Sequence, residues 1–456
     1  MRILSRRLFL ASSGAALVAG PALGAPPRPA PVPDLPRSGW VDAVVVGAGA
    51  AGIAAGRRLA AAGKRFVVLE AADEIGGRCV TDTKIFGVAY DRGARWIYAA
   101  DINPLAKLGT QSGLDIYSAP PGQRIRIGRR YAREGEMEDF LASLVRANTA
   151  IADAARKSDV ACAQALPKEL GEWRPTIEFV LGPYACSKEL SDLSTADFSR
   201  SGERDHSAFC RQGFGALLAK LAAPLPILLA TPVKTIEWWS RTRIEIETTK
   251  GQFRTSAVIL TVSTNVLASG KIKLAPDLPK RHMEAATKLK LGSRDHVALE
   301  LTGNPLGLRS DELVFEKSEG KQTAAILGNT SGSTICVIDV GGNFGRDLSA
   351  NGAAAMIDFA TTWLGGLYGT DMKSAVKRRH ATCWNNEPWV LGASSAAAPG
   401  AQSVRKILTE PLSNRIFLAG EATHETLWGT VNGAWESGER AADAVVKLLG
   451  GPSKRG

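Results

Sequence analysis

Apolar residues occur in two kinds of segment along the chain, short nearly continuous runs and longer stretches rich in alanine. Residues 41–46 (VDAVVV) and 65–69 (RFVVL) are short apolar runs, which are typical of buried parallel strands. The Ala-rich stretch between them, which ends at about residue 62, predicts a helix. A strand, a helix and a second strand in this order predict a βαβ unit within an α/β domain.

Later segments repeat these patterns over most of the chain. Residues 296–301 (HVALEL) and 334–340 (TICVIDV) predict strands, and residues 352–367 predict a helix. Residues 137–170 are rich in Ala and Leu and predict further helices. With 456 residues the chain is too long for one ordinary core, so we expect two domains.

A glycine-rich turn joins the first apolar run to the predicted helix. Gly47, Gly49 and Gly52 form the pattern GAGAAG. The first glycine permits a tight turn, the second lets the backbone approach a pyrophosphate, and the third lets the helix pack on the sheet. Glu70 ends the second strand, where a carboxylate can accept hydrogen bonds from a ribose. The ordered set predicts a dinucleotide site at the helix N-terminus.

The first residues have the features of an export signal. A basic head with Arg6 and Arg7 precedes an apolar run, and small residues near Ala25 suit a cleavage site. Because SRRLFL resembles the twin-arginine signal, we expect residues 1–25 to be a twin-arginine-type signal peptide that exports the folded protein to the periplasm. Residues 26–39 are expected to be a Pro-rich linker. The apolar run is too short for a stable membrane span.

Charge narrows the range of partners. The formal net charge is +11, and without residues 1–25, which hold three arginines and no acid, it is 11 − 3 = +8. The basic residues are scattered and form no aromatic-interleaved stripe, so nucleic-acid binding has little support. A basic surface still suits the docking of a redox partner.

The six cysteines show neither a C-x-x-C pair nor the spacing of a metal site. One or two disulfides stay open in an oxidising compartment, although free buried thiols are the main expectation for a chain of this size. No cluster of His, Cys and carboxylate residues in the sequence indicates a metal.

Three further motifs follow the first glycine turn. Residues 76–78 (GGR) form a second glycine turn with a cation suited to a pyrophosphate, and residues 91–96 contain D-x-G-x-x-W. Residues 415–445 read RIFLAGEATHETLWGTVNGAWESGERAADAV. With these motifs, in this order, the chain resembles the flavin-containing amine oxidase family, which includes monoamine oxidases, polyamine oxidases and histone lysine demethylases.

The resemblance implies an α/β fold in which a Rossmann-like FAD-binding domain is interleaved with an α+β substrate domain. The implied FAD-binding domain comprises residues 40–118, 205–279 and 385–450, and the implied substrate domain comprises residues 119–204 and 280–384.

The resemblance also implies which residues contact FAD. They are Gly47, Gly49, Ala51, Gly52, Glu70, Gly77, Arg78, Arg95, Trp96, Val233, Gly420, Glu421, Thr430 and Val431. Thr430 and Val431 are expected to open a helix whose N-terminus faces the flavin ring. Covalently flavinylated monoamine oxidases have a cysteine where this chain has Ala393, so FAD is expected to bind without a covalent link.

The catalytic residues implied by the resemblance are His296, Trp384 and Thr430, and here the chain departs from its family. His296 stands where amine oxidases place a lysine that holds a water against flavin N5. A histidine there can take a proton from a substrate amine as a general base, position a water, or only fill space, and all three alternatives stay open. Ser394 and Thr430 stand where monoamine oxidases have two tyrosines, so the aromatic cage is absent or rebuilt from Trp389 or Trp428.

The locations of the other four histidines are predicted from their neighbours in the sequence. His206, His282 and His380 lie beside arginines and are expected at the surface. His424 and Glu425 are either a solvated pair or part of the pocket entrance.

The function expected from the resemblance is FAD-dependent oxidation of the C–N bond of a small-molecule amine. Hydride would pass to flavin N5 to give an imine, with O2 or a periplasmic carrier such as a c-type cytochrome as electron acceptor. Two alternatives stay open: a desaturase or dehydrogenase of a non-amine substrate, and a catalytically weak FAD-binding partner subunit. The oligomeric state also stays open, a homodimer included.

Overall fold

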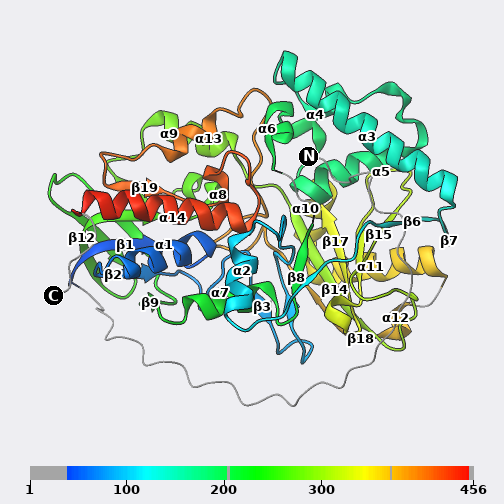
Figure 1. Cartoon of the computed structure of the whole chain (residues 1–456), viewed down its shortest axis with the longest axis horizontal. Coiled ribbons are helices and arrows are strands. Elements are labelled where there is room, and N and C mark those ends of the chain that lie inside the picture. Colours follow the sequence, from blue (N-terminus) through cyan, green and yellow to red (C-terminus); the bar gives the residue numbers. More distant parts are fainter. Residues whose placement is uncertain (1–38, 203–205, 370–371, 451–456) are drawn as a thin grey trace.

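The computed structural model describes residues 39–202, 206–369 and 372–450, which form two sheets with helices packed on them (Figure 1). The expected signal peptide and all but the last residue of the expected linker lie outside the described residues. Gly39, expected to end that linker, is instead the first residue of strand β1.

The first sheet has eight strands in the order β13-β10-β11-β12-β1-β2-β9, with β19 paired to β12. Its strands are β1 (Gly39–Val46), β2 (Phe66–Leu69), β9 (Ile227–Leu228), β10 (Val233–Glu237), β11 (Ile244–Thr248), β12 (Gln252–Leu260), β13 (Lys273–Ala275) and β19 (Ile416–Leu418). β1 runs parallel to both of its neighbours, β12 and β2. The predicted βαβ unit is therefore confirmed and lies in the middle of the sheet.

Both faces of this sheet are buried. Ala43 and Val45 belong to a core with helices α1 (Ala50–Ala61), α7 (Phe214–Ala222) and α14 (Val431–Leu448), and Val44 and Val46 belong to a second core on the other face. This burial on both sides explains why residues 41–46 form a nearly continuous apolar run. Helices α1 and α14 lie side by side over the sheet (Figure 1).

The second sheet has seven strands in the order β18-β14-β17-β16-β15-β6-β7. They are β6 (Arg124–Ile127), β7 (Arg130–Tyr131), β14 (Arg294–Leu301), β15 (Glu312–Glu316), β16 (Ala325–Gly328), β17 (Ile335–Gly341) and β18 (Val376–Ala381). Neighbouring strands are antiparallel except β6 and β15. The register sets His296 of β14 opposite Asp339 of β17.

Helices cover this second sheet as well. Helix α11 (Gly352–Tyr368) packs on one side, where Val297 and Leu299 point. The long helix α3 (Glu134–Lys157) and the shorter α4 (Cys162–Ala165), α5 (Arg174–Phe179) and α6 (Thr195–Arg200) form a helical region, whose core also includes Phe315 and Ala325 of this sheet. Within the described part of the chain, no helix is long and apolar enough to cross a membrane.

One helix departs from the expected domain boundary. Residues 280–384 were expected in the substrate domain, but α9 (Lys280–Lys288) packs into the core of the first sheet through Ala285 and Ala286. His282 of this helix is buried, with 1% exposure, so the expectation of a surface position is wrong. All six cysteines lie in the described residues and are free thiols.

The close approach of α1 and α14 depends on Gly438. A Cβ atom at this position would lie 2.0 Å from the carbonyl oxygen of Ala51. We therefore expect Gly438→Ala to lower the free energy of unfolding by about 1–3 kcal/mol, because the backbone of α1 would have to move. Urea titration followed by tryptophan fluorescence measures the change.

Gly366 in α11 is the matched control, because it is an exposed helical glycine with open space around its missing Cβ. Gly366→Ala should raise the free energy of unfolding by about 0.5–1 kcal/mol, since alanine restricts the unfolded chain. Equal effects of the two substitutions would contradict the packing argument.

Candidate functional site

A cavity of about 450 Å³ is lined by residues from both sheets. Its walls bring together every predicted catalytic and cofactor residue except Gly52. The size lies within the range of small-molecule and cofactor sites in proteins.

The turn between β1 and α1 forms one wall of this cavity. Gly47 has φ +103°, a conformation that favours glycine. A Cβ at Gly52 would lie 1.9 Å from the carbonyl oxygen of Gly47, so Gly52 shapes the turn from behind and does not line the cavity. Ala50 and Ala51 line it, and the N–H groups of this first helical turn have no intrahelical acceptor. These donors fit a pyrophosphate.

Glu70 lies in the same wall, at the end of β2. Its carboxylate accepts hydrogen bonds from the backbone N–H of Ala48 (2.6 Å) and of Ala72 (2.9 Å). Burial raises the pKa of Glu70, although these backbone donors oppose the shift. A carboxylate has about four lone-pair sites, so the two oxygens keep acceptor capacity for ribose hydroxyls.

Arg78 lines the cavity at the second glycine turn. Its Nη1 donates to the carbonyl oxygen of Ala393 (2.5 Å) and to Oε1 of Glu421 (2.9 Å). Ala393 stands where covalently flavinylated monoamine oxidases have a cysteine. Its carbonyl oxygen contacts the guanidinium of Arg78, and both residues line the cavity.

Glu421 is buried, and protein groups occupy its oxygens. Besides Arg78, the donors are the N–H and hydroxyl of Ser395 (3.1 and 2.7 Å) and the N–H of Gly429 (2.8 Å). Burial alone would raise the pKa of Glu421, but the charge of Arg78 and the Ser395 hydroxyl lower it. The carboxylate of Glu421 thus holds Arg78 and two loops, a role that the sequence did not reveal.

Arg95 and Trp96 reach the cavity from the segment after β4 (Tyr90–Asp91). Nη2 of Arg95 donates to Oδ1 of Asp311 (2.7 Å), and its guanidinium lies 4.6 Å from the ring centre of Phe209. A buried arginine needs such partners, and they fix its place in the wall.

His296 forms part of another wall, on β14. Its Nδ1 lies 2.6 Å from Oδ1 of Asp339, and Nη2 of Arg294 donates to Oδ2 of the same carboxylate (3.0 Å). Burial alone would raise the pKa of Asp339, but Arg294 and His296 hold it well below its usual range. The carboxylate is therefore ionised at neutral pH. Its negative charge lies against Nδ1 of the imidazole, so Nε2 is the ring nitrogen left for a ligand.

Trp384 and Thr430 have different kinds of support. The backbone N–H of Trp384 donates to Asp295 (2.8 Å), and its indole N–H donates to the carbonyl oxygen of Arg92 (3.1 Å), so the ring is held as a wall. Thr430 is the N-cap of α14: its hydroxyl donates to Leu427 (2.6 Å) and accepts from the N–H of Gly433 (3.0 Å). Its single hydroxyl proton is used within the loop, so Thr430 acts here as a helix cap.

Several expectations need correction or completion. His380 lines the cavity, so its expected surface position is wrong. Trp389 also lines it, whereas Trp428 is fully buried outside the lining, so an aromatic cage cannot be rebuilt from Trp428. His424 binds Glu436 (3.0 Å), and like Glu425 it lies outside the lining.

Sequence reasoning missed Asp339 and Arg294. An acidic residue within the apolar run TICVIDV was the available signal, because buried carboxylates need partners. Among the described residues, no group of three or more His, Cys, Asp or Glu side chains is arranged to hold a metal ion.

The glycine turn, the two helix N-termini and the cavity that they share are features of a dinucleotide-binding protein with the amine oxidase fold. A sequence model described as flavin containing amine oxidoreductase matches residues 50–446. The chain therefore belongs to the flavin-containing amine oxidoreductase family.

Comparison with individual proteins agrees with this family. The human lysine-specific histone demethylase 2 is 25% identical, with 88% of this chain and 53% of that protein covered. The probable polyamine oxidase 4 of Arabidopsis thaliana is also 25% identical, over 89% of this chain and 87% of the relative. The cyclohexylamine oxidase of Brevibacterium oxydans IH-35A has the same fold, with a TM-score of 0.74 at 19% identity over 90% and 99% of the two chains. The chain spans about half the length of the demethylase relatives.

The two backbone donors of Glu70 generate a prediction for cofactor binding. Glu70→Gln should raise the dissociation constant of FAD by about tenfold or more, because the amide NH2 would face one of these N–H groups. Flavin fluorescence during serial dilution of the holoprotein measures the constant. Glu237→Gln, on an exposed position of β10, is the control and should leave it unchanged. An unaltered constant in Glu70→Gln would remove Glu70 from the site.

Proposed function

We propose that this protein is an enzyme that oxidises the C–N bond of a small-molecule amine with non-covalently bound FAD. The observation that carries the proposal is the pairing of His296 with the ionised Asp339 in the wall of the cavity that also holds the dinucleotide turn. A pair of this kind serves acid–base chemistry on a substrate and has no evident use in a binding subunit without turnover.

The residues of the cavity wall fit FAD. The first turn of α1 and Arg78 would hold the pyrophosphate, Glu70 the ribose, and the first turn of α14 the polar edge of the flavin. Bound FAD supplies the two-electron chemistry, because it accepts a hydride from the carbon next to the amine nitrogen. Ala393 offers no nucleophile for a covalent link.

His296 prepares the substrate. Only a neutral amine gives up hydride readily from the adjacent carbon, whereas amines are largely protonated at neutral pH. Nε2 of His296 accepts the ammonium proton, and Asp339 stabilises the imidazolium that results. Trp384 excludes water from the reacting carbon, and the oxidised product is an imine that water hydrolyses.

The walls favour an amine with a bulky or extended carbon frame. Ser394 stands where monoamine oxidases have a tyrosine, and its hydroxyl bonds to that of Ser187 (2.9 Å) in the cavity lining. With Ser394 and Thr430 at the positions of the two tyrosines, the cavity has more room than it would with a tyrosine pair. The similarity to a cyclohexylamine oxidase and to a probable polyamine oxidase supports an amine of this kind.

We also propose that residues 1–25 direct export of the folded protein to the periplasm. The substitution of His296 for the family lysine favours an electron carrier of that compartment, such as a c-type cytochrome, over O2 as the acceptor. The positive net charge supports docking of an acidic carrier surface.

Loss of the base should slow substrate oxidation. We expect His296→Gln to lower the anaerobic rate of flavin reduction by about 10²–10⁴-fold. Stopped-flow absorbance with a panel of amines measures the rate.

The matched control is His380→Gln, which alters another histidine of the cavity wall that lacks a carboxylate partner. Its reduction rate should stay within about threefold of the wild type, well below the effect of a lost general base. Equal rates in His296→Gln and the wild type would show that His296 only fills space.

Exchange of His296 for lysine tests the acceptor. His296→Lys should speed reoxidation of the reduced flavin by air, since it restores the family residue. Reoxidation by cytochrome c should stay at the wild-type rate. If air reoxidises the wild type and the variant equally fast, the proposed dependence of the acceptor on residue 296 fails.

A further inference from the structure

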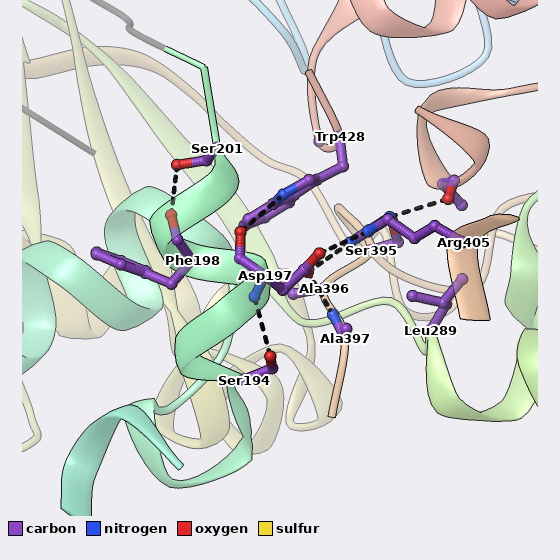
Figure 2. Close-up of polar contacts among 12 residues, drawn as sticks. Ser194, Asp197, Phe198, Ser201, Leu289, Ser395, Ala396, Ala397, Arg405 and Trp428 are labelled. Atoms are coloured by element: carbon purple, nitrogen blue, oxygen red, sulfur yellow. Dashed lines mark hydrogen bonds and ion pairs between the residues drawn. The ribbon is translucent and has the colours of Figure 1, made fainter. Parts of the chain in front are cut away.

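A fully buried ion pair joins the helical region to the cofactor side of the molecule. Nε and Nη2 of Arg405 in α13 (Val404–Thr409) donate to the two carboxylate oxygens of Asp197 in α6, each over 2.7 Å. Both side chains have 0% exposure. Figure 2 shows the two planar groups facing each other between segments that are far apart in the sequence.

The pair also orders the loops around it. Nη1 of Arg405 donates to the carbonyl oxygen of Ala422 (2.9 Å) and to the hydroxyl of Ser395 (3.2 Å). Asp197 accepts a further bond from the N–H of Ala397 (2.7 Å), and its carbonyl oxygen accepts one from the indole of Trp428 (3.3 Å) (Figure 2).

These contacts continue to the cavity through Ser395. Its hydroxyl accepts from Arg405 and donates to Oε2 of Glu421 (2.7 Å), and Oε1 of Glu421 accepts from Arg78. A chain of polar contacts therefore runs from the interior to Arg78, which lines the cavity. In order, its members are Asp197, Arg405, Ser395, Glu421 and Arg78.

Stability alone does not account for such a pair. Desolvation of two charges offsets most of their attraction, and hydrophobic replacements of buried ion pairs are often neutral or stabilising. Arg405 contributes something that an apolar side chain would not: a planar fork whose donors fix three separate segments at set angles.

We propose that Asp197 and Arg405 are positioning residues for the cofactor site. They hold Ser395 and Ala422 so that Glu421 aims the guanidinium of Arg78 at the phosphates of the bound dinucleotide. The inference rests on the proposed binding of FAD and extends it to two residues that do not line the cavity.

The first test replaces the planar guanidinium of Arg405 with the ammonium group of a lysine. In Arg405→Lys the ammonium group can still pair with Asp197 but cannot reach all three segments. We expect the dissociation constant of FAD, measured by flavin fluorescence on dilution of the holoprotein, to rise by about tenfold. The control is Arg126→Met, which removes another buried arginine that does not line the cavity, and its constant should stay within about twofold of the wild type.

A double-mutant cycle separates positioning from general loosening. Ser395→Ala removes the link to Glu421, so it should also raise the constant, and Arg405→Lys should add little in its presence. Two results would overturn the proposal. One is that the factors by which the two substitutions raise the dissociation constant of FAD multiply in the double variant. The other is a constant in Arg405→Lys that stays within about twofold of the wild type.

A charge-free variant covers the case in which Arg405→Lys does not fold. Asp197→Leu with Arg405→Met leaves no unpaired buried charge, so it should fold, with a melting temperature lowered only modestly by the loss of the acceptor for the N–H of Ala397. Its dissociation constant for FAD should still be raised about tenfold, and a wild-type constant would overturn the proposal. Failure of the wild type itself to bind FAD would instead refute the proposed function.

Discussion

The site depends on how closely two helices approach one sheet. Helix α1 and helix α14 lie side by side, and each begins at the cavity with N–H groups that have no acceptor inside the helix. Glycines make this approach possible, because a Cβ at Gly52 would strike the turn of β1 and a Cβ at Gly438 would strike α1. The partial positive charge of both helix ends therefore lies at the same cavity, where it would stabilise an anionic ligand.

The second sheet supplies the histidine–aspartate pair of the cavity wall. His296 and Asp339 lie on neighbouring antiparallel strands in direct register, with Arg294 on the far side of the carboxylate. Because side chains alternate across a strand, a register shift of one residue in β14 would turn His296 away from the cavity and from Asp339. The contact of His296 with Asp339 thus depends on the pairing of strands that are distant in the sequence. The part of the wall with the glycine turns is formed by residues that are close in the sequence.

This difference explains how much could be predicted from the sequence. The βαβ unit, the two glycine turns and the Thr430 helix start are local patterns, and the structure contains them at the expected residues. Asp339 and His380 owe their place in the cavity to pairing with distant strands, which no local pattern specifies. Helix α9 was assigned to the wrong core for the same reason, since only tertiary packing decides which sheet an amphipathic helix covers.

The pairing of α1 with α14 also bears on biosynthesis. The first strands of the cofactor wall leave the ribosome early, whereas β19 and α14, which complete that wall, are among the last elements to be translated. A nascent chain therefore lacks part of the cavity wall until Ala434 has been translated, and flavin binding at this site would follow synthesis of nearly the whole chain. Until α14 packs, the apolar face of α1 that it covers is exposed to water, and such a surface promotes aggregation.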